Sequence, residues 1–440
     1  MHLQIEKLVY GGDGLARLPA DDKGPGKTVF LPFVIPGETV EASMAETRPG
    51  FARAKLNTVL ERSPERVEPG CPYFGRCGGC QYQHIAYEAQ LRYKTEILRE
   101  TLRRTAKLEL QSEIQIHSAE PWHYRNRTRM RVQHTPKFQL GYYRHSSHEL
   151  LPVEQCPISS PLINQAIRAV WTLGGEKQLP QSVHGIQLFA NQDDRQMLVE
   201  LHVRPGGSAT ECQTFAAALH QLLPAIQGVI VFASSPAEDD SRQFAPLTSV
   251  HPEPGQAIGC DSLSYQVEDH DFQVHAGSFF QTNRFLVGEL MQTAVGNHQG
   301  RAALDLYAGV GLFTLPLALR FDQVLAVEAS PQSLSDLRRN APANVKAIRA
   351  TTEAFLFDRG PKLALDLVLV DPPRAGLGER TAKALGRMPV PRVTYVSCDP
   401  ATLARDLRPL LESGFKVEHA HLVDLFPQTA HMETVMHLVR

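Results

Sequence analysis

The sequence has no long hydrophobic run. Its residues are 42% hydrophobic and 21% charged, yet no stretch approaches the roughly 20 apolar residues that span a bilayer as a helix. The first residues, Met1 to Lys7, also lack the apolar core of a signal peptide. We therefore expect a cytoplasmic protein with no membrane partner.

Cysteine is scarce, and charge of one sign does not dominate. Seven cysteines among 440 residues argue against a disulfide framework and favour metal binding or nucleophilic chemistry. The formal net charge of −2 excludes a generally basic coat for nucleic acid, so local charge is the better guide to such a partner. The length predicts two or three domains.

The chain divides into three segments that differ in their expected secondary structure. Residues 1–62 hold short β runs broken by Gly and Pro, which predicts a small β-barrel. Residues 63–265 mix strands and helices, with a loop-like break at 234–240, which predicts a central α+β domain. Residues 266–440 alternate apolar β runs with helical segments, which predicts a doubly wound, Rossmann-like α/β domain.

A glycine turn follows the first β run of this last segment. Gly309 and Gly311 permit close approach of the backbone to a ligand, and Glu328 ends the next β run, where an acid can accept both ribose hydroxyls of an adenosine. An acid that merely ends a strand is the alternative. The third glycine of a dinucleotide fingerprint is replaced by Thr314, so the pattern favours a cofactor without a pyrophosphate, most commonly S-adenosylmethionine.

Two later segments carry further candidate chemistry. Asp371-Pro372-Pro373-Arg374 follows a continuously apolar β run, and its prolines fix the backbone so that the carboxylate points into a cleft. Cys398 ends another β run, where a nucleophile would sit, although a lone buried cysteine is more often inert. Glu433 lies between two stretches that we interpret as buried. A stiffened loop and a surface charge are the alternatives for Asp371 and Glu433.

One reaction requires this set of groups. Carbon 5 of a pyrimidine is a poor nucleophile, and a thiolate that adds to carbon 6 makes it enolate-like, so that it attacks a sulfonium methyl group. A base must then remove the proton from carbon 5 before the thiol leaves. Cys398 and Glu433 are our candidates for the thiol and the base.

In combination, four motifs resemble the bacterial RNA 5-methyluridine methyltransferase family over nearly the whole chain. The beginning of the chain, through Tyr10 to Gly14, is similar to the RNA-binding TRAM barrel of that family. The motifs are Asp305 to Gly311, Asp371 to Arg374, Ser397 to Pro400 and His431 to Thr434.

The resemblance implies a class I methyltransferase domain and a role for particular residues. Cys398 would be the nucleophile, Glu433 the general base, and Asp371 the residue that touches uracil and cofactor. Many relatives carry Asn where this chain has Leu312, and the loss of one hydrogen bond should weaken cofactor binding without abolishing the chemistry. The residues expected to bind S-adenosylmethionine are Gln281, Tyr307, Gly309, Glu328 and Asp371.

Four cysteines form a candidate metal site. Three of them lie within ten residues and the fourth lies far downstream. Four thiolates suit a tetrahedral zinc ion or an iron-sulfur cube, and the spacing does not separate the two. The resemblance implies a [4Fe-4S] cluster, because the ribosomal-RNA branch of the family carries one with this pattern. The four are Cys71, Cys77, Cys80 and Cys156, whereas we interpret Cys212 and Cys260 as structural.

Four arginines predict a contact with RNA. From Pro121 to Ser147 there is no Asp or Glu, and the arginines alternate, which places them on one face of a strand. Aromatic side chains suited to stacking on bases lie in the same segment, at Tyr124, Phe138, Tyr142 and Tyr143. A solvated strand face is the alternative. The four are Arg125, Arg127, Arg129 and Arg131.

The leading hypothesis is S-adenosylmethionine-dependent methylation of uridine at carbon 5 in RNA. By family analogy, 23S ribosomal RNA is favoured over transfer RNA as the substrate. An amino-group methyltransferase of the Asp-Pro-Pro type would need neither Cys398 nor Glu433. The hypothesis from another class is a non-catalytic iron-sulfur protein that binds RNA. A monomer is the default expectation.

Overall fold

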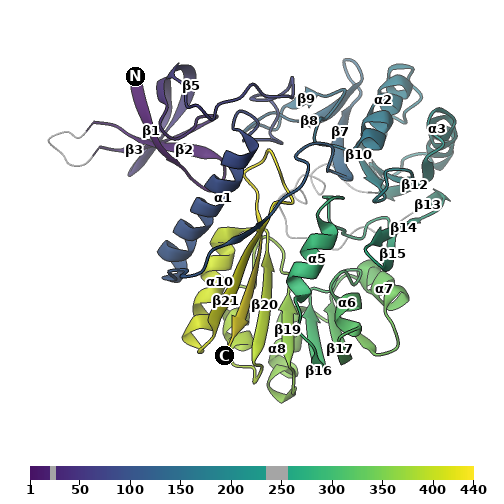
Figure 1. Ribbon diagram of the computed structural model, residues 1–440. Helices are drawn as coiled ribbons and strands as arrows, with labels where there is room; N and C mark the ends of the chain where they lie inside the picture. The colour runs from purple at the N-terminus through teal and green to yellow at the C-terminus, as the bar shows by residue number, and fades with distance from the viewer. Residues whose placement is uncertain (20–25, 234–255) are drawn as a thin grey trace.

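The computed structural model describes residues 1–19, 26–233 and 256–440. It contains an N-terminal barrel, a central sheet and a C-terminal sheet, with a long helix running between the barrel and the C-terminal sheet (Figure 1). The loop-like break expected at 234–240 lies outside the described residues. No helix within the described ranges is long and apolar enough to cross a membrane.

The N-terminal barrel forms because apolar residues alternate along its strands. Leu3 and Ile5 of the first strand point inward and are 2% exposed, while their neighbours face solvent, as the period of a half-buried strand requires. The strands close in the order β1-β2-β3-β5-β4, which confirms the predicted barrel. They are β1 (His2–Leu8), β2 (Asp13–Arg17), β3 (Thr28–Pro32), β4 (Thr39–Arg48) and β5 (Phe51–Glu61).

The central sheet has seven strands in the order β13-β12-β11-β10-β7-β8-β9. Two helices cover one face with an apolar core, and a separate hairpin, β14 with β15, packs toward the other face. The strands are β7 (Arg127–Gln133), β8 (Gln139–Tyr143), β9 (Leu150–Pro152), β10 (Val183–Ala190), β11 (Met197–Val203), β12 (Ile226–Ala233), β13 (Gln256–Gly259), β14 (Ser262–Val267) and β15 (His270–His275); the helices are α2 (Pro161–Gly175) and α3 (Ala209–Leu222).

The C-terminal sheet has eight strands in the order β18-β17-β16-β19-β20-β22-β21-β6. Neighbours from β18 to β20 run parallel, and β22 runs antiparallel to β20 and β21. Its strands are β16 (Gly300–Leu306), β17 (Phe321–Glu328), β18 (Val345–Arg349), β19 (Leu367–Val370), β20 (Arg392–Ser397), β21 (Lys416–Val423), β22 (Glu433–Val439) and β6 (Gln115–His117).

Helices cover both faces of the C-terminal sheet, which confirms the doubly wound α/β prediction. One apolar core joins the sheet to α8, α9 and α10, and a second joins its other face to α5 and α6. Apolar residues along the central strands, such as the fully buried β19, meet both cores, as expected for a sheet covered on both sides. The helices are α5 (Val287–Val295), α6 (Thr314–Ala318), α7 (Pro331–Asn340), α8 (Thr352–Asp358), the 3₁₀ turn Gly360–Lys362, α9 (Glu379–Gly386) and α10 (Pro400–Glu412).

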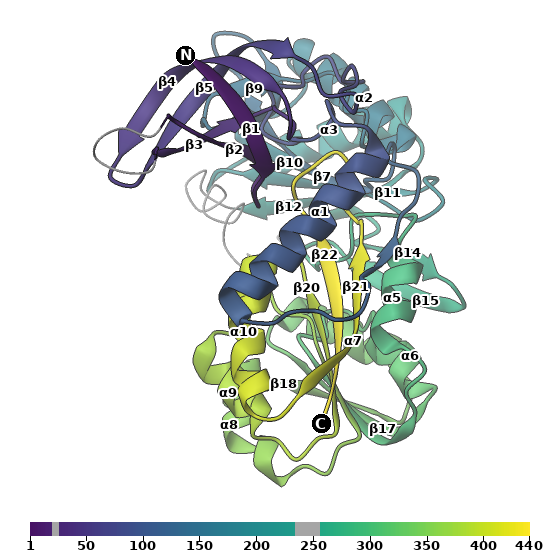
Figure 2. The ribbon, with the colours of Figure 1, turned by 60° about the vertical axis from the view of Figure 1, so that its left-hand side comes forward.

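Part of the chain upstream of the central sheet joins the C-terminal sheet. The helix α1 (Tyr87–Thr101), followed by a π-helical turn at Leu102–Ala106, contributes apolar side chains to the core on the α10 side. Figure 2 shows α1 running from the barrel toward α10. The short strand β6 then pairs in parallel with β21 at the edge of the sheet. The C-terminal sheet therefore includes a strand from outside residues 266–440.

Candidate active site

Three strand ends bring the expected catalytic residues to one edge of the C-terminal sheet. Strand β19 ends one residue before Asp371, β20 ends one residue before Cys398, and β22 begins at Glu433. In the antiparallel pair β20 and β22, Ser397 lies opposite Thr434. The next position along β20 is Cys398 and the preceding one along β22 is Glu433, so the register places thiol and carboxylate across from each other.

The parallel neighbour supplies the second acid at this edge. Val370 of β19 lies opposite Tyr395 of β20, so Asp371 follows its strand close to where β20 reaches Cys398. The fixed backbone of Pro372 and Pro373 ends the strand there, because proline has no N–H to continue the ladder.

Burial keeps all three groups protonated more readily than in water. The pKa of Asp371 is raised to about 7 by burial, and that of Glu433 is raised by burial and by the negative charge of Asp371. Burial also raises the pKa of the Cys398 thiol, and the charge of Glu433 adds to this effect. Two buried acids with raised pKa values beside a thiol suit acid-base chemistry.

Arg374 opposes these shifts, and the sequence interpretation gave it no role. Its positive charge lowers the pKa of both Cys398 and Glu433. Its Nη2 atom lies 3.5 Å from Nε2 of His431. Burial and the charge of Arg374 lower the pKa of His431 to about 3, so this imidazole is neutral. The signal was present in the sequence, since Arg374 is the last residue of the Asp-Pro-Pro-Arg motif.

The N-terminal barrel contacts the turn that carries the nucleophile. Tyr10 donates a hydrogen bond from its hydroxyl to Oδ2 of Asp399, 2.9 Å away. The other oxygen of Asp399 accepts hydrogen bonds from the N–H groups of Ala401 and Thr402, each at 2.9 Å, and so caps helix α10. Motif reasoning missed this contact because Tyr10 and Asp399 lie at opposite ends of the chain.

The expected cofactor turn and its acid lie together. The N–H of Gly309 donates to Oε2 of Glu328 at 2.9 Å, and the N–H of Ser330 donates to Oε1 at 2.6 Å. Gly309 has a φ of 56° and Tyr307, unusually for a non-glycine residue, a φ of 62°. Strained backbone of this kind persists where the surroundings hold it, often at ligand sites. Gly311 has a φ of 104°, a conformation that residues with a Cβ atom rarely adopt, so the backbone favours glycine there.

The remaining cofactor candidates differ in their surroundings. Gln281 is buried, at 6% exposure. Leu312 packs into the apolar core on the α5 side and offers no hydrogen-bonding group. Asp305 was not assigned a role by the sequence interpretation: it is fully buried, burial raises its pKa to about 7, and Thr314 donates to one of its oxygens. Its other oxygen, Oδ1, has no hydrogen-bond partner among the residues that the structure describes.

The four candidate metal-binding cysteines gather in one region. Burial raises the pKa of the Cys71, Cys77 and Cys80 thiols, that of Cys77 to about 11, and the negative charge of Cys156 contributes to each shift. No three His, Cys, Asp or Glu side chains in residues 1–19, 26–233 and 256–440 are arranged to hold a single metal ion. Cys212 is buried and Cys260 is exposed.

The alternating arginines lie on or beside strand β7, as the spacing predicts, but they do not form an exposed row. Arg127 is 9% exposed; its Nη2 atom lies 3.0 Å from Oε1 of Glu200 and its guanidinium group stacks over Phe189. Arg129 contacts His202, Arg131 is 6% exposed, and Arg125 lies close enough to Cys156 for the two charges to interact. Their contact with RNA stays a prediction.

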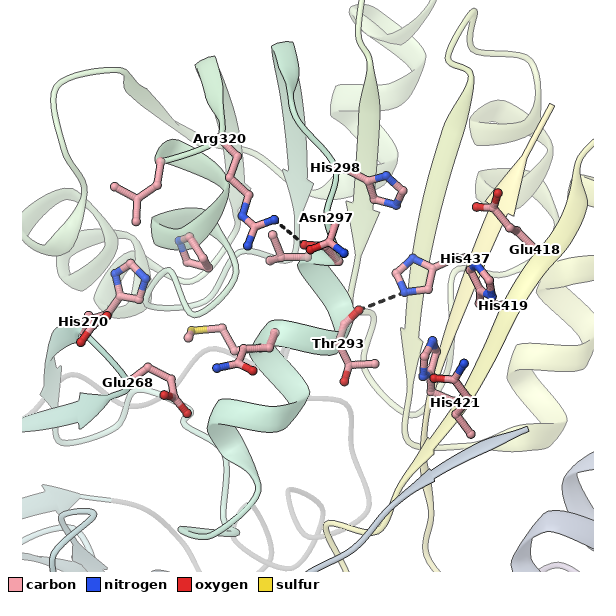
Figure 3. A pocket seen from close by; sticks show the side chains of 18 residues that line it. Glu268, His270, Thr293, Asn297, His298, Arg320, Glu418, His419, His421 and His437 are labelled. Carbon is pink, nitrogen blue, oxygen red and sulfur yellow. Dashed lines mark hydrogen bonds between the residues drawn. The ribbon is translucent and has the colours of Figure 1, made fainter. Parts of the chain in front are cut away.

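A separate cavity of about 670 Å³ lies away from the nucleophile, between α5 and the strands β21 and β22. Figure 3 shows its imidazoles. His437 donates from Nε2 to the carbonyl of Thr293 at 2.9 Å, and its Nδ1 atom lies 3.1 Å from the hydroxyl of Thr394, which donates to the neutral ring. Burial and neighbouring histidines lower the pKa of His421 and of His437 to about 4. The labelled imidazoles in this cavity are His270, His298, His419, His421 and His437.

The sheet order, the glycine turn with its acid, and the thiol and acids at the strand ends define a methyltransferase of the doubly wound class. The family model described as tRNA (Uracil-5-)-methyltransferase matches residues 260–440, and the TRAM domain model matches residues 1–56. The chain belongs to the uracil-C5 RNA methyltransferase family.

Whole-length relatives support this assignment. The 23S rRNA (uracil(1939)-C(5))-methyltransferase RlmD of Chromohalobacter salexigens is 33% identical, over 100% of this chain and 89% of the relative. An uncharacterised RNA methyltransferase of Halalkalibacterium halodurans is 30% identical, over 99% and 96%. The crystal structure of Pyrococcus abyssi tRNA (uracil-54, C5)-methyltransferase in complex with S-adenosyl-L-homocysteine shares the fold, with a TM-score of 0.77 at 24% identity and full coverage of both chains.

Proposed function

We propose that this protein methylates carbon 5 of a uridine in RNA through a covalent adduct with Cys398. The observation that carries the proposal is the register of β20 and β22, which places Cys398 across from Glu433. Asp371 follows the neighbouring strand at the same edge. A thiol and two buried acids at one edge of the sheet are the groups that this chemistry needs.

Cys398 and Glu433 each act in a particular step of the proposed reaction. Cys398 loses its thiol proton to solvent, which the charge of Arg374 favours. The thiolate then adds to carbon 6 of uracil and moves the electron pair of the ring double bond to carbon 5. S-adenosylmethionine, when bound, supplies an electrophilic methyl group to that carbon. Glu433 then removes the proton from carbon 5, the bond from carbon 6 to sulfur breaks, and Cys398 leaves as a thiolate.

The cofactor residues fit an adenosine. Each Glu328 oxygen accepts one backbone hydrogen bond in the structure and keeps a further lone pair for a ribose hydroxyl. The glycine turn beside it allows the backbone to approach the ligand. Gln281, Tyr307 and Asp371 are the other groups that we assign to cofactor binding.

We propose 23S ribosomal RNA as the substrate, because relatives that are 31% and 33% identical over 98% and 100% of this chain carry the name 23S rRNA uracil-C5-methyltransferase. Mapping 5-methyluridine in total RNA from cells that lack the gene tests this choice. Loss of the mark from one 23S position supports it, and loss from transfer RNA alone overturns it.

We also propose that the four gathered cysteines hold a [4Fe-4S] cluster. Burial, and after it the charge of neighbouring cysteines, raises the pKa of these thiols. A cationic iron centre would stabilise the thiolate forms. Anaerobic purification with a visible spectrum and iron analysis tests the proposal. A colourless protein with zinc and no iron would overturn it.

The covalent mechanism is tested with RNA that contains 5-fluorouridine. Carbon 5 then carries no removable proton, so the wild-type protein with methyl donor should form an adduct that survives denaturant. Cys398→Ala should form none, whereas Cys260→Ala, which changes an exposed cysteine, should behave as wild type. An adduct that persists in Cys398→Ala would refute Cys398 as the nucleophile, and the lack of any adduct with the wild-type protein would favour an amino-group methyltransferase.

A further inference from the structure

The segment that directly precedes the proposed base, residues 424–432, is a buried loop. It joins β21 to β22 without regular secondary structure, yet Asp424 and Met432 are fully buried and Gln428 is 4% exposed. A loop without a ladder must find other partners for its buried backbone groups. Those partners determine where Glu433 lies.

Most of those partners come from residues 81–94, more than 300 positions upstream. Tyr124, Asn283 and His117 are among the others. The carbonyl of Gln428 accepts hydrogen bonds from the N–H groups of Gln81 and Tyr82, at 3.1 and 3.0 Å. The side chains of Gln90 and Gln428 complete a reciprocal pair, in which Gln90 Oε1 accepts from the N–H of Gln428 and Gln90 Nε2 donates to Gln428 Oε1, each at 3.0 Å.

A buried ion pair fixes the start of the same loop. Lys94 and Asp424 are both fully buried, and Lys94 Nζ lies 2.6 Å from Asp424 Oδ1 and 3.0 Å from the carbonyl of Phe426. Tyr87 donates to the other oxygen of Asp424 at 2.9 Å. A fully buried pair of charges adds little net stability but specifies one arrangement, because neither charge can be left alone.

Gln81 connects this loop to the cysteine segment. Its Oε1 atom accepts from the N–H of Ala430 at 3.1 Å, and its Nε2 atom donates to the carbonyl of Gly78 at 3.0 Å. Gly78 lies between Cys77 and Cys80, so one side chain spans the loop of the proposed cluster and the loop of the proposed base.

We propose that Gln81, Gln90 and Lys94 are positioning residues that hold residues 424–432, and with them Glu433, in the orientation needed for proton removal. The inference rests on the proposed function, in which Glu433 acts only after the methyl group has been transferred. A misplaced base therefore slows the elimination step and leaves the addition of Cys398 to carbon 6 unaffected.

Two variants at one position separate the contacts. Gln81→Met removes both side-chain hydrogen bonds, whereas Gln81→Glu keeps an acceptor for the N–H of Ala430 and removes only the donor to Gly78. Gln227→Met is the control: its side chain is half-buried and bonds to backbone carbonyls at the far end of the central sheet.

The first measurement uses RNA with ordinary uridine, methyl donor and anaerobically purified holoprotein. We expect Gln81→Met to accumulate a denaturant-stable adduct and to release product roughly 10–100-fold more slowly, with adduct formation near the wild-type rate. Gln81→Glu and Gln227→Met should release product as wild type does. Equal losses of adduct formation and product release in Gln81→Met, or no loss, would overturn the proposal.

Hydrogen exchange of the backbone provides a measurement independent of turnover. Residues 424–432 should exchange faster in Gln81→Met than in Gln81→Glu or Gln227→Met, and the barrel should be unchanged. Unchanged exchange in this loop would refute the positioning role, even if wild-type protein formed no adduct at all. That last result would instead contradict the proposed function.

Discussion

Two buried glutamates, Glu200 and Glu433, have pKa values that are shifted in opposite directions. Glu200, on β11, has a side chain that is 4% exposed, and it faces Arg127 at 3.0 Å and the N–H of Gly277 at 3.1 Å. Burial alone would raise the pKa of Glu200, but His202, Arg127 and Gly277 hold it well below its usual value. Glu433 is 3% exposed, and burial and its acidic neighbour Asp371 raise its pKa.

The comparison shows that burial alone does not set the protonation state of an acid, because neighbouring charges and hydrogen bonds also shift its pKa. Glu200 is ionised and fixed by a cation, so it joins the arginine strand β7 to β11. Within residues 1–19, 26–233 and 256–440, Glu433 forms no salt bridge; the charge of Arg374 only partly offsets the burial and the charge of Asp371 that raise its pKa. The first arrangement maintains structure, whereas the second leaves a group available for chemistry.

Replacing each glutamate by glutamine should separate these roles, and Glu433→Gln should give the largest effect. We expect turnover to fall about 10³-fold, with the adduct on ordinary uridine accumulating, because an amide cannot accept the proton from carbon 5. The free energy of unfolding should stay the same or rise, because the neutral amide resembles the protonated acid. Retained turnover, or a clear loss of stability, would contradict the comparison.

Glu200→Gln should show the opposite pattern. The substitution leaves the guanidinium group of Arg127 buried without its anion, which should lower the free energy of unfolding by about 3–5 kcal/mol. Urea unfolding followed by tryptophan fluorescence measures this, since Trp122 and Trp171 both lie outside the C-terminal sheet. Glu412→Gln, at an exposed ion pair with Arg408, is the control and should change little. A stable Glu200→Gln protein would show that the pair does not fix β7.

Most of the fold was predictable because its signals are local. Alternating burial marks the barrel strands, and apolar runs separated by helices mark the C-terminal sheet. The strand β6 was not predictable, because three residues pair with β21 across some 300 positions of chain. Pairing of that kind depends on tertiary packing and leaves no periodicity in a segment so short.

The residues of the candidate site were likewise predictable only where their sequence signals are local. Strand ends and motifs identified Cys398, Asp371 and Glu433, because each lies directly after or at the start of an apolar strand. The contacts of Tyr10 with Asp399 and of Lys94 with Asp424 join residues 389 and 330 positions apart, so no motif contains them. The alternation of arginines predicted a common face, but it could not show that β11 places Glu200 and His202 against that face.

His421 and His437 of the separate cavity are bases whose pKa values are also shifted by burial, as the pKa values of the two glutamates are. The folded-state pKa of His437 is about 4, below the unfolded value of about 6.5. Its stability contribution is therefore complete above about pH 6.5 and is lost as the pH falls toward 4. His437→Gln should reduce this acid-induced loss by roughly 1–3 kcal/mol, measured by urea unfolding at pH 7 and pH 4.5. The same loss in both proteins would exclude His437 as its source, and His2→Gln, at an exposed position, is the control.

Asp371→Asn should give the smallest effect, a shift in the pH profile of kcat/KM. It should show whether Asp371 raises the pKa of Glu433. The base must be unprotonated to act, so kcat/KM should fall as the pH drops through the raised pKa of Glu433. Removing the negative charge of Asp371 lowers that pKa, so the acidic limb of the profile should move about one unit to lower pH, with a smaller maximum. Asp322→Asn, at an exposed acid on β17, should leave the limb in place. An unmoved limb in Asp371→Asn would mean that burial alone raises the pKa of Glu433, and that the contrast with Glu200 depends on the partners that Glu200 contacts directly, Arg127 among them.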